Sequence, residues 1–150
     1  MTDPQQPLDP LSKRRLRLWI RMLAVTRRAE TQLRDYLRRN HETTLPRFDV
    51  MAALWRRGEP VTMTELSRML LVSNSNVTAI CGPLEKDGII ARLPCDEDRR
   101  TVRVTLTPAG RALFETIATG HEAEISQIFA PLDGEDLDQL RALLRKLAET

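Results

Sequence analysis

Residues 62–110, TMTELSRMLLVSNSNVTAICGPLEKDGIIARLPCDEDRRTVRVTLTPAG, decide the fold of this chain. Thr62 stands three positions before Glu65, which is the capping-box spacing that satisfies free amides at a helix start. Ser73 suits the N-cap of a second helix, and Gly88 can supply the left-handed conformation that ends it. The stretch therefore predicts two short helices joined by a turn.

Two strand-like runs follow the second predicted helix. Residues 89–93 and 101–106 contain isoleucine, valine and threonine, and the second run alternates apolar with polar side chains as a half-buried strand does. Residues 94–100 between them form a polar tip. Short helices followed by a hairpin predict a winged helix-turn-helix, which is a mainly α fold with a small β wing.

The wing carries a specific motif. Residues 98–110, DRRTVRVTLTPAG, resemble the wing and exit of the MarR family of bacterial transcription regulators. Residues 65–66 and 84–88 fit the helix-turn-helix of the same family, and the helical flanks extend the resemblance over about residues 10–148. The resemblance implies an obligate homodimer that binds a pseudo-palindromic operator in double-stranded DNA and usually releases it when a small effector binds.

The flanking regions predict helices that complete a single domain over residues 1–150. We expect residues 10–45 and 107–150 to form a helical dimerisation region, and residues 46–106 to form the winged helix-turn-helix DNA-binding region. The first long helix is apolar on more than one side, which a small monomer cannot easily cover. An intramolecular bundle is the alternative. In the last helix, leucines repeat at spacings of three and four residues, at Leu137, Leu140, Leu144 and Leu147.

The overall charge is weak for a DNA-binding protein. The 150 residues include 23 basic and 21 acidic side chains, so the net charge is +2. Residues 1–61 carry +6 and residues 107–150 carry −4, which leaves residues 62–106 neutral. DNA affinity must then depend on a few placed cations, on helix N-termini that face phosphates, and on a dimer that doubles each contact.

The start of the second helix is a run of short polar side chains. Asparagine can bind adenine through two hydrogen bonds, and the methyl group of threonine can contact thymine. Capping needs only one such residue, although the alternative that residues 73–76 merely cap the helix stays open. The DNA-binding residues expected in the two helices are Thr62, Thr64, Ser73, Asn74, Ser75, Asn76 and Thr78.

In the wing, Arg99 and Arg100 follow three acidic residues, which would repel phosphate unless they pair internally. By the family resemblance, Asp98 pairs within the wing and orients an arginine into the minor groove. We favour Arg100 for that role, with Arg99 next, because narrow A·T-rich grooves attract guanidinium groups. A solvated charged turn is the alternative.

The second helix departs from the family pattern. Family members usually carry basic residues at the positions of Ala79 and Pro83. A proline inside a helix removes a hydrogen bond and costs about 3 kcal/mol or more. We therefore expect this helix to bend near Cys81 or to start at a shifted position, which leaves its first turn to do most of the DNA reading.

Aromatic and methionine side chains suggest an effector pocket between the dimerisation helices and the DNA-binding region. Residues 45–54, LPRFDVMAAL, resemble a family branch that governs catabolism of hydroxycinnamates and other aromatic acids, some of whose members sense the acyl-CoA thioester. The first helix offers cations for thioester phosphates at Arg14, Arg15, Arg17, Arg21, Arg27 and Arg28. Ordinary core packing and a solvated helix face are the alternatives. The expected ligand-binding residues are Trp19, Met22, Phe48, Met51 and Arg21.

Other classes of function find less support. His41 and His121 lie far apart, with no nucleophile motif, glycine-rich phosphate loop or zinc spacing, so we expect no enzyme, metal site or cofactor. Redox sensing through Cys95 is a rival, although the acidic residues beside it disfavour a thiolate. The chain starts without a basic leader and has no apolar run that could cross a bilayer, so we expect a cytoplasmic protein without membrane contact.

Overall fold

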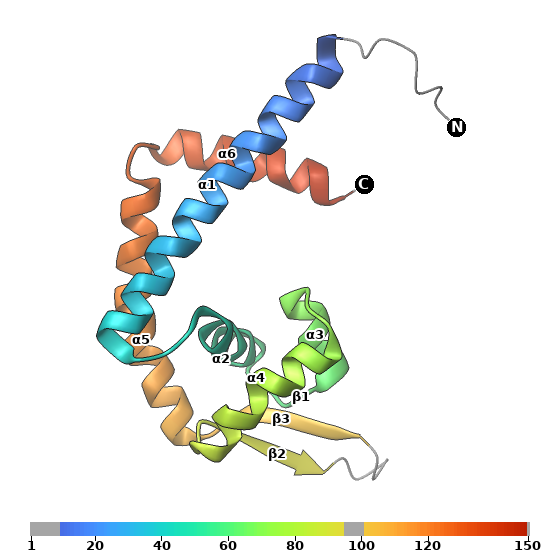
Figure 1. Ribbon diagram of the computed structural model, residues 1–150, viewed down its shortest axis with the longest axis vertical. Coiled ribbons are helices and arrows are strands. Elements are labelled where there is room, and N and C mark those ends of the chain that lie inside the picture. Colours follow the sequence, from blue (N-terminus) through green and yellow to red (C-terminus); the bar gives the residue numbers. More distant parts are fainter. Residues whose placement is uncertain (1–9, 95–100, 150) are drawn as a thin grey trace.

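The computed structural model describes residues 10–94 and 101–149, which form six helices and one three-stranded sheet (Figure 1). The elements are, in chain order, α1 (Pro10–His41), α2 (Leu45–Arg57), β1 (Val61–Thr62), α3 (Met63–Leu70), α4 (Asn74–Lys86), β2 (Ile90–Pro94), β3 (Val102–Leu106), α5 (Pro108–Phe129) and α6 (Gly134–Ala148). The predicted fold class is confirmed. None of the described helices combines the length and the apolarity that a bilayer span requires.

The boundaries of the helix-turn-helix follow from local residues. The hydroxyl of Thr62 accepts a hydrogen bond from the amide of Glu65, and the carboxylate of Glu65 accepts one from the amide of Thr62, both at 3.1 Å. This is the predicted capping box. After α4, Gly88 adopts the left-handed conformation with φ of 73°. Each of these signals involves residues within one helical turn, so it can be recognised in the sequence.

The sheet is antiparallel, in the order β1-β3-β2. β2 and β3 form the predicted hairpin, in which Ile90 lies opposite Leu106. The two-residue β1 was not expected; it pairs with β3 and places Val61 opposite Val104. All four of these side chains are buried, so the sheet contributes an apolar face to the core.

One apolar core joins the helix-turn-helix to the long helices. It draws on α2, α3, α4 and the sheet, together with the C-terminal half of α1 and the N-terminal half of α5. Cys81 on α4 belongs to this core, and burial raises the pKa of its thiol. The largest fully buried side chains are Leu37, Met51, Leu66, Leu84, Ile90, Ile117, Val50, Val61, Val77, Val104 and Cys81.

The helices α1 and α5 pack side by side (Figure 1). Nε2 of Gln32 on α1 donates a hydrogen bond to Oε2 of Glu124 on α5 at 2.8 Å. One helical turn earlier on α5, a Cβ added at Gly120 would overlap the phenol ring of Tyr36. The absence of a side chain at Gly120 therefore permits the close approach of the two helices.

The N-terminal half of α1 and the whole of α6 project away from this core (Figure 1). Within the single chain, α6 contributes no buried residue. A folded monomer rarely exposes an apolar surface of this kind. The large exposed apolar side chains of the two helices are Leu11, Leu16, Leu18, Trp19, Ile20, Val25, Leu137, Leu140, Leu143, Leu144 and Leu147.

Candidate nucleic-acid interface

The first turn of α4 is built on a side-chain cap. The Oγ of Ser73 accepts a hydrogen bond from the amide of Asn76 at 3.2 Å, and Ser73 has an extended backbone conformation. Val77, which is fully buried, anchors the same turn to the core. The predicted N-cap is confirmed, and α4 begins where the sequence places it.

The structure brings the other predicted contact residues of α4 together around this cap. Asn74, Ser75 and Asn76 are exposed, and among the described residues the side-chain amides of Asn74 and Asn76 have no hydrogen-bond partner. The hydroxyl of Thr78 donates to the carbonyl of Asn74 at 2.9 Å, which leaves its methyl group for apolar contact. Two unpaired primary amides and a methyl group on one exposed turn are suited to contact base edges.

The two threonines predicted as DNA contacts near α3 differ in their surroundings. Thr62 is half-buried, and its hydroxyl serves the capping box. Thr64 is exposed, and its carbonyl accepts a hydrogen bond from Ser67 at 2.8 Å. The observed role of Thr62 is structural, and DNA contact by either residue stays a prediction.

Pro83 lies inside α4, which runs unbroken from Asn74 to Lys86. Of the two alternatives, the shifted helix start is wrong, because buried Val77, Cys81 and Leu84 hold the register of α4 against the core. The bend near Cys81 stays a prediction. Pro83 cannot donate to the carbonyl of Ala79, since it has no N–H.

The predicted wing residues Cys95, Asp98, Arg99 and Arg100 lie outside the described residues. The hairpin that carries them is tied to α4, because Nε of Arg92 on β2 donates to Oε2 of Glu85 at 2.6 Å. Arg103 adds an exposed cation on β3. The alternation of β3 is the signal that points to Arg103, whereas nothing in the sequence pairs Arg92 with Glu85.

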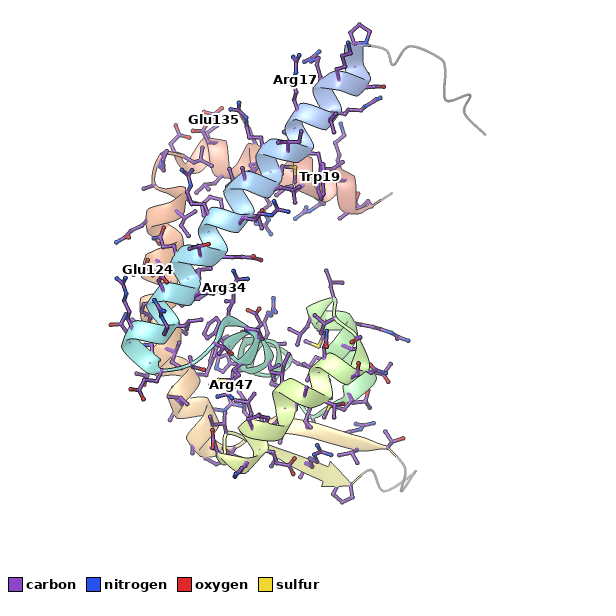
Figure 2. All side chains as sticks on the ribbon, in the orientation of Figure 1. Arg17, Trp19, Arg34, Arg47, Glu124 and Glu135 are labelled. Atoms are coloured by element: carbon purple, nitrogen blue, oxygen red, sulfur yellow. The ribbon has the colours of Figure 1, made fainter. Side chains whose placement is uncertain are left out.

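The predicted ligand-binding residues do not come together in the single chain. Phe48 and Met51 on α2 are 4% and 1% exposed and belong to the core. Trp19 is 56% exposed on the projecting part of α1, away from α2 in Figure 2. Met22 is half-buried and Arg21 is exposed on the same part of α1. Phe48 and Met51 thus pack in the core, and ligand binding by these residues stays a prediction.

The position of Phe48 in the core is defined by two rings of α5. Its ring stacks on Phe114 at a centroid distance of 5.5 Å and on His121 at 4.3 Å. Burial lowers the pKa of His121, which favours the neutral imidazole between the helices. His121 is thus a packing residue of the junction between α2 and α5.

Two adjoining hollows lie along α4 where it faces the start of α2. The first, of about 710 Å³, is bounded by the C-terminal half of α1, the start of α2 and α4. The second, of about 380 Å³, is bounded by α2, the end of α3 and α4. Both are lined by Pro46, Ala79 and Ile80, so they adjoin each other, and we call the two hollows together the α4 groove. The sequence did not reveal this groove, because its walls come from separate elements.

Asp49 on α2 lines the second hollow together with Asn76 of α4. Partial burial raises the pKa of Asp49 to about 6, and the nearby carboxylate of Glu30 acts in the same direction while Arg56 opposes it. The carboxylate is therefore ionised at neutral pH but easier to protonate than an ordinary aspartate.

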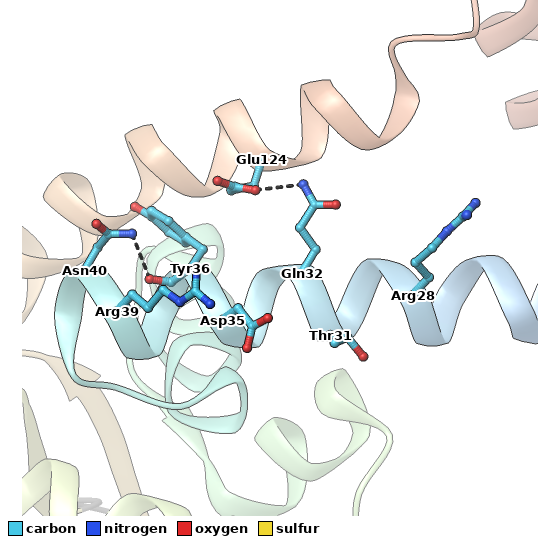
Figure 3. A pocket seen from close by; sticks show the side chains of 8 residues that line it. All are labelled: Arg28, Thr31, Gln32, Asp35, Tyr36, Arg39, Asn40 and Glu124. Carbon is cyan, nitrogen blue, oxygen red and sulfur yellow. Dashed lines mark hydrogen bonds between the residues drawn. The ribbon is translucent and has the colours of Figure 1, made fainter.

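A third hollow, of about 490 Å³, lies between α1 and α5 (Figure 3). No residue of α4 lines it, so it has no direct contact with the candidate DNA-reading turn. Across the described residues, no group of histidine, cysteine and acidic side chains is placed to hold a metal ion. The residues that line the third hollow are Arg28, Thr31, Gln32, Asp35, Tyr36, Arg39, Asn40 and Glu124.

Known proteins resemble this chain in sequence and in fold. Residues 43–102 match the family model described as MarR family. The transcriptional regulator PecS of Dickeya dadantii (strain 3937) is 34% identical over 102 residues, which are 67% of this chain and 61% of that protein, so less than two thirds of its length is spanned. The organic hydroperoxide resistance transcriptional regulator of Bacillus subtilis (strain 168) is 31% identical over 107 residues, 71% of each protein. These relatives are transcription regulators and not enzymes.

One similar solved structure contains bound DNA. A mutant MarR from E. coli complexed with operator DNA superposes with a TM-score of 0.80 at 25% identity, covering 93% of this chain and 99% of that one. AbsC, a MarR family regulator from Streptomyces coelicolor, shares the fold with a TM-score of 0.82 at 24% identity, covering 97% of each chain.

Proposed function

This chain belongs to the MarR family of DNA-binding transcription regulators, and from this premise we propose that it is a homodimeric repressor that binds a pseudo-palindromic operator and is released by a small effector. The observation that carries the proposal is the exposed first turn of α4, where Asn74 and Asn76 present amides without a partner among the described residues. A side-chain amide that the fold does not use is available for a base edge.

Phosphate contacts follow from the same turn. Ser73 caps the backbone amide of Asn76. The backbone amides of Asn74 and Ser75 also lie in the first turn, where the helix itself offers them no acceptor. Free amides and the helix dipole favour a phosphate at this position. This contact compensates for the neutral charge of residues 62–106.

Dimerisation is supported by the apolar side chains that the single chain leaves exposed. Leu140 and Leu144 on α6 are 37% and 44% exposed, and Leu16 and Trp19 on α1 are 55% and 56% exposed. A two-fold axis through these helices would bury them and present two copies of α4 to DNA. Such a dimer reads two half-sites about one helical turn of DNA apart.

The wing completes the proposed interface. We assign Arg100 to the minor groove, with Arg99 beside it and Asp98 as the partner that orients the arginine. Thr62 and Thr64 at the start of α3 are proposed as additional contacts to the DNA backbone. The support is the sequence motif of residues 98–110 and the tie between Arg92 and Glu85, which fixes the hairpin against α4.

An aromatic acid or its CoA thioester is the proposed effector class. The support is the resemblance of residues 45–54 to a branch that responds to such compounds, and the presence of the α4 groove beside that segment. Occupation of a groove lined by α4 would favour a conformation with lower DNA affinity. Linkage then requires that DNA lowers effector affinity by the same factor.

A redox response through Cys95 is a second candidate. One relative is named as an organic hydroperoxide resistance regulator, which favours this alternative. Cys81 does not share in it, because its thiol is buried and burial raises its pKa. Loss of DNA binding on peroxide treatment of the wild type, but not of Cys95→Ser, would identify this mechanism.

Selection of random DNA duplexes by the purified protein tests the main proposal. We expect the recovered sequences to share two inverted half-sites, and sedimentation to show two chains bound to each duplex. Recovery of no common sequence would contradict operator recognition. One chain bound per duplex at full affinity would contradict the dimer.

A further inference from the structure

The turn between α3 and α4 holds one residue in an unfavourable backbone conformation. The amide of Val72 donates a hydrogen bond to the carbonyl of Ser67 at 3.1 Å. The amide of Leu71 donates to the carbonyl of Arg68 at 3.4 Å. These two hydrogen bonds form a Schellman motif, which places one residue in the left-handed region. Leu71 occupies that position with φ of 56°, where glycine is the usual residue because a Cβ is disfavoured.

The side chain of Leu71 gains almost no packing inside the chain. It is 91% exposed, more than any other large apolar side chain among the described residues. The adjacent Val72 is 38% exposed. Neither the backbone conformation nor the core therefore favours a leucine at this position. Strained residues gather at functional sites, so a side chain that is both strained and exposed points to a contact outside the single chain.

The place of Leu71 in the chain indicates what it contacts. Ser73 caps α4 two residues later, and Asn74 is the first residue of the candidate DNA-reading turn. Consecutive Cα atoms are about 3.8 Å apart, so the Cα atoms of Leu71 and Asn74 are separated by at most about 11 Å. This distance corresponds to about three base pairs of DNA. Because α3 and α4 lie apart from α6, the contact belongs with the DNA and not with the proposed dimer interface (Figure 1).

The chemistry of a leucine side chain limits its partner on DNA. It has no charge and no hydrogen-bonding group, so it can neither hold a phosphate nor distinguish donors from acceptors on base edges. The apolar group that a base pair presents in the major groove is the 5-methyl group of thymine. Removal of that methyl group and of the exposed leucine from water is favourable. The amides of Asn74 and Asn76 and the side chain of Leu71 would thus read different features of neighbouring base pairs.

We infer that Leu71 is a specificity-determining residue, whose side chain packs on the 5-methyl group of one thymine in each operator half-site. That thymine lies within about three base pairs of the base contacted by Asn74. The inference rests on the proposed function, because it takes the first turn of α4 as the part of the chain that reads bases. The strain at Leu71 is then offset by contact with DNA and not by packing in the free protein.

Replacement of thymine by deoxyuridine tests this contact, because it removes the methyl group and leaves every hydrogen-bonding group in place. The operator recovered by selection is synthesised with one such replacement per half-site, at each thymine in turn. Fluorescence anisotropy then gives the affinity of the purified protein for each duplex. We expect one thymine at which the wild type loses roughly four-fold per half-site, as burial of one methyl group provides.

Variants assign the sensitive thymine to a side chain. Leu71→Gly should bind the unmodified operator more weakly by a similar factor and should no longer respond to deoxyuridine at that position. Leu71→Asn should behave in the same way, which excludes backbone flexibility as the cause, since asparagine tolerates the left-handed region but keeps its Cβ. Leu71→Met keeps an apolar side chain and should retain the response. Thr78→Ser should affect a different thymine, and Leu113→Ala on α5 is the control for loss of an exposed leucine.

The outcome for Leu71 is separable from the outcome for operator binding. A wild type that selects an operator but tolerates deoxyuridine at every position would overturn the inference and leave the proposed function intact. Equal losses for Leu71→Gly on the operator and on a random duplex would also overturn it, because a contact to the sugar–phosphate backbone does not depend on the base. If no operator is selected at all, the proposed function fails and the inference fails with it.

Discussion

The hydroxyl of Tyr36 on α1 donates a hydrogen bond to the backbone carbonyl of Ile117 on α5 at 2.9 Å. The same oxygen lies 2.9 Å from Nε2 of His41, which can donate to it in the tautomer that carries a proton there. Tyr36 thereby fixes the approach of α1 to α5, the two helices that connect the projecting apolar region to the DNA-binding core.

Gly120→Ala should destabilise the fold through this contact. The added Cβ would overlap the ring of Tyr36, and overpacking of this kind costs about 1–3 kcal/mol. Alanine has the better helix propensity, which acts in the opposite direction. Gly134→Ala is the control, since nothing lies within 4 Å of a Cβ added there. Urea unfolding should show a larger loss for Gly120→Ala; equal changes would exclude Tyr36 as the cause.

Leu71→Gly should stabilise the protein. Leu71 ends α3 in the left-handed region, with φ of 56° and ψ of 40°, and its side chain is 91% exposed. A non-glycine residue in this conformation costs about 1–2 kcal/mol, which glycine avoids. Part of this gain is offset, because glycine loses more conformational entropy when the chain folds. If the net stabilisation is about 1 kcal/mol, the midpoint temperature of thermal unfolding should rise by a few degrees. Leu70→Gly, in the helix and half-buried, should instead destabilise.

Asn76→Ala should lower affinity for the selected operator by about 1–3 kcal/mol and leave affinity for a random duplex nearly unchanged. The substitution removes a side-chain amide that is proposed to contact a base edge. This amide has no partner among the described residues, so its removal should cost the fold little stability. Fluorescence anisotropy with both duplexes provides the measurement. Equal losses on both would show that Asn76 contacts only the backbone.

Leu140→Asp combined with Leu144→Asp should abolish dimerisation and, with it, operator binding. Both side chains are exposed in the single chain, so the substitutions should not unfold the monomer, but they would bury charges at the proposed interface. Ala142→Asp, on the opposite face of α6, is the matched control. Sedimentation velocity reports the mass. A variant that stays dimeric would place the interface elsewhere.

Asp49 should make stability fall as the pH rises. Its folded pKa is raised to about 6 above the ordinary value of 3.8, so the folded state holds the proton more tightly than the unfolded state. The stabilisation is fully present below the unfolded pKa and is lost as the pH rises through the folded pKa. Urea unfolding of the wild type and Asp49→Asn on both sides of that window should show the variant gaining relative stability at the higher pH. A constant difference between them would mean that Asp49 titrates normally.

Much of the helix-turn-helix was determined by the sequence alone, because its signals act between residues close in the chain. The capping box of Thr62 and Glu65, the cap at Ser73 and the left-handed Gly88 each satisfy backbone groups within one helical turn. The alternation of residues 101–106 likewise reports which face of β3 is buried. Local hydrogen bonding and side-chain periodicity can therefore be predicted without the tertiary structure.

Contacts between distant segments were decided only by the tertiary structure. Pairing of Val61 with Val104 creates β1, and the stacking of Phe48 on His121 places that aromatic ring in the core. The same packing leaves Trp19 far from that core. The α4 groove arises because the start of α2 meets α4 beside α1, and no local pattern encodes the distance between helices. Such features depend on which apolar surfaces pack together, and a linear pattern identifies the surface of a helix but not its partner.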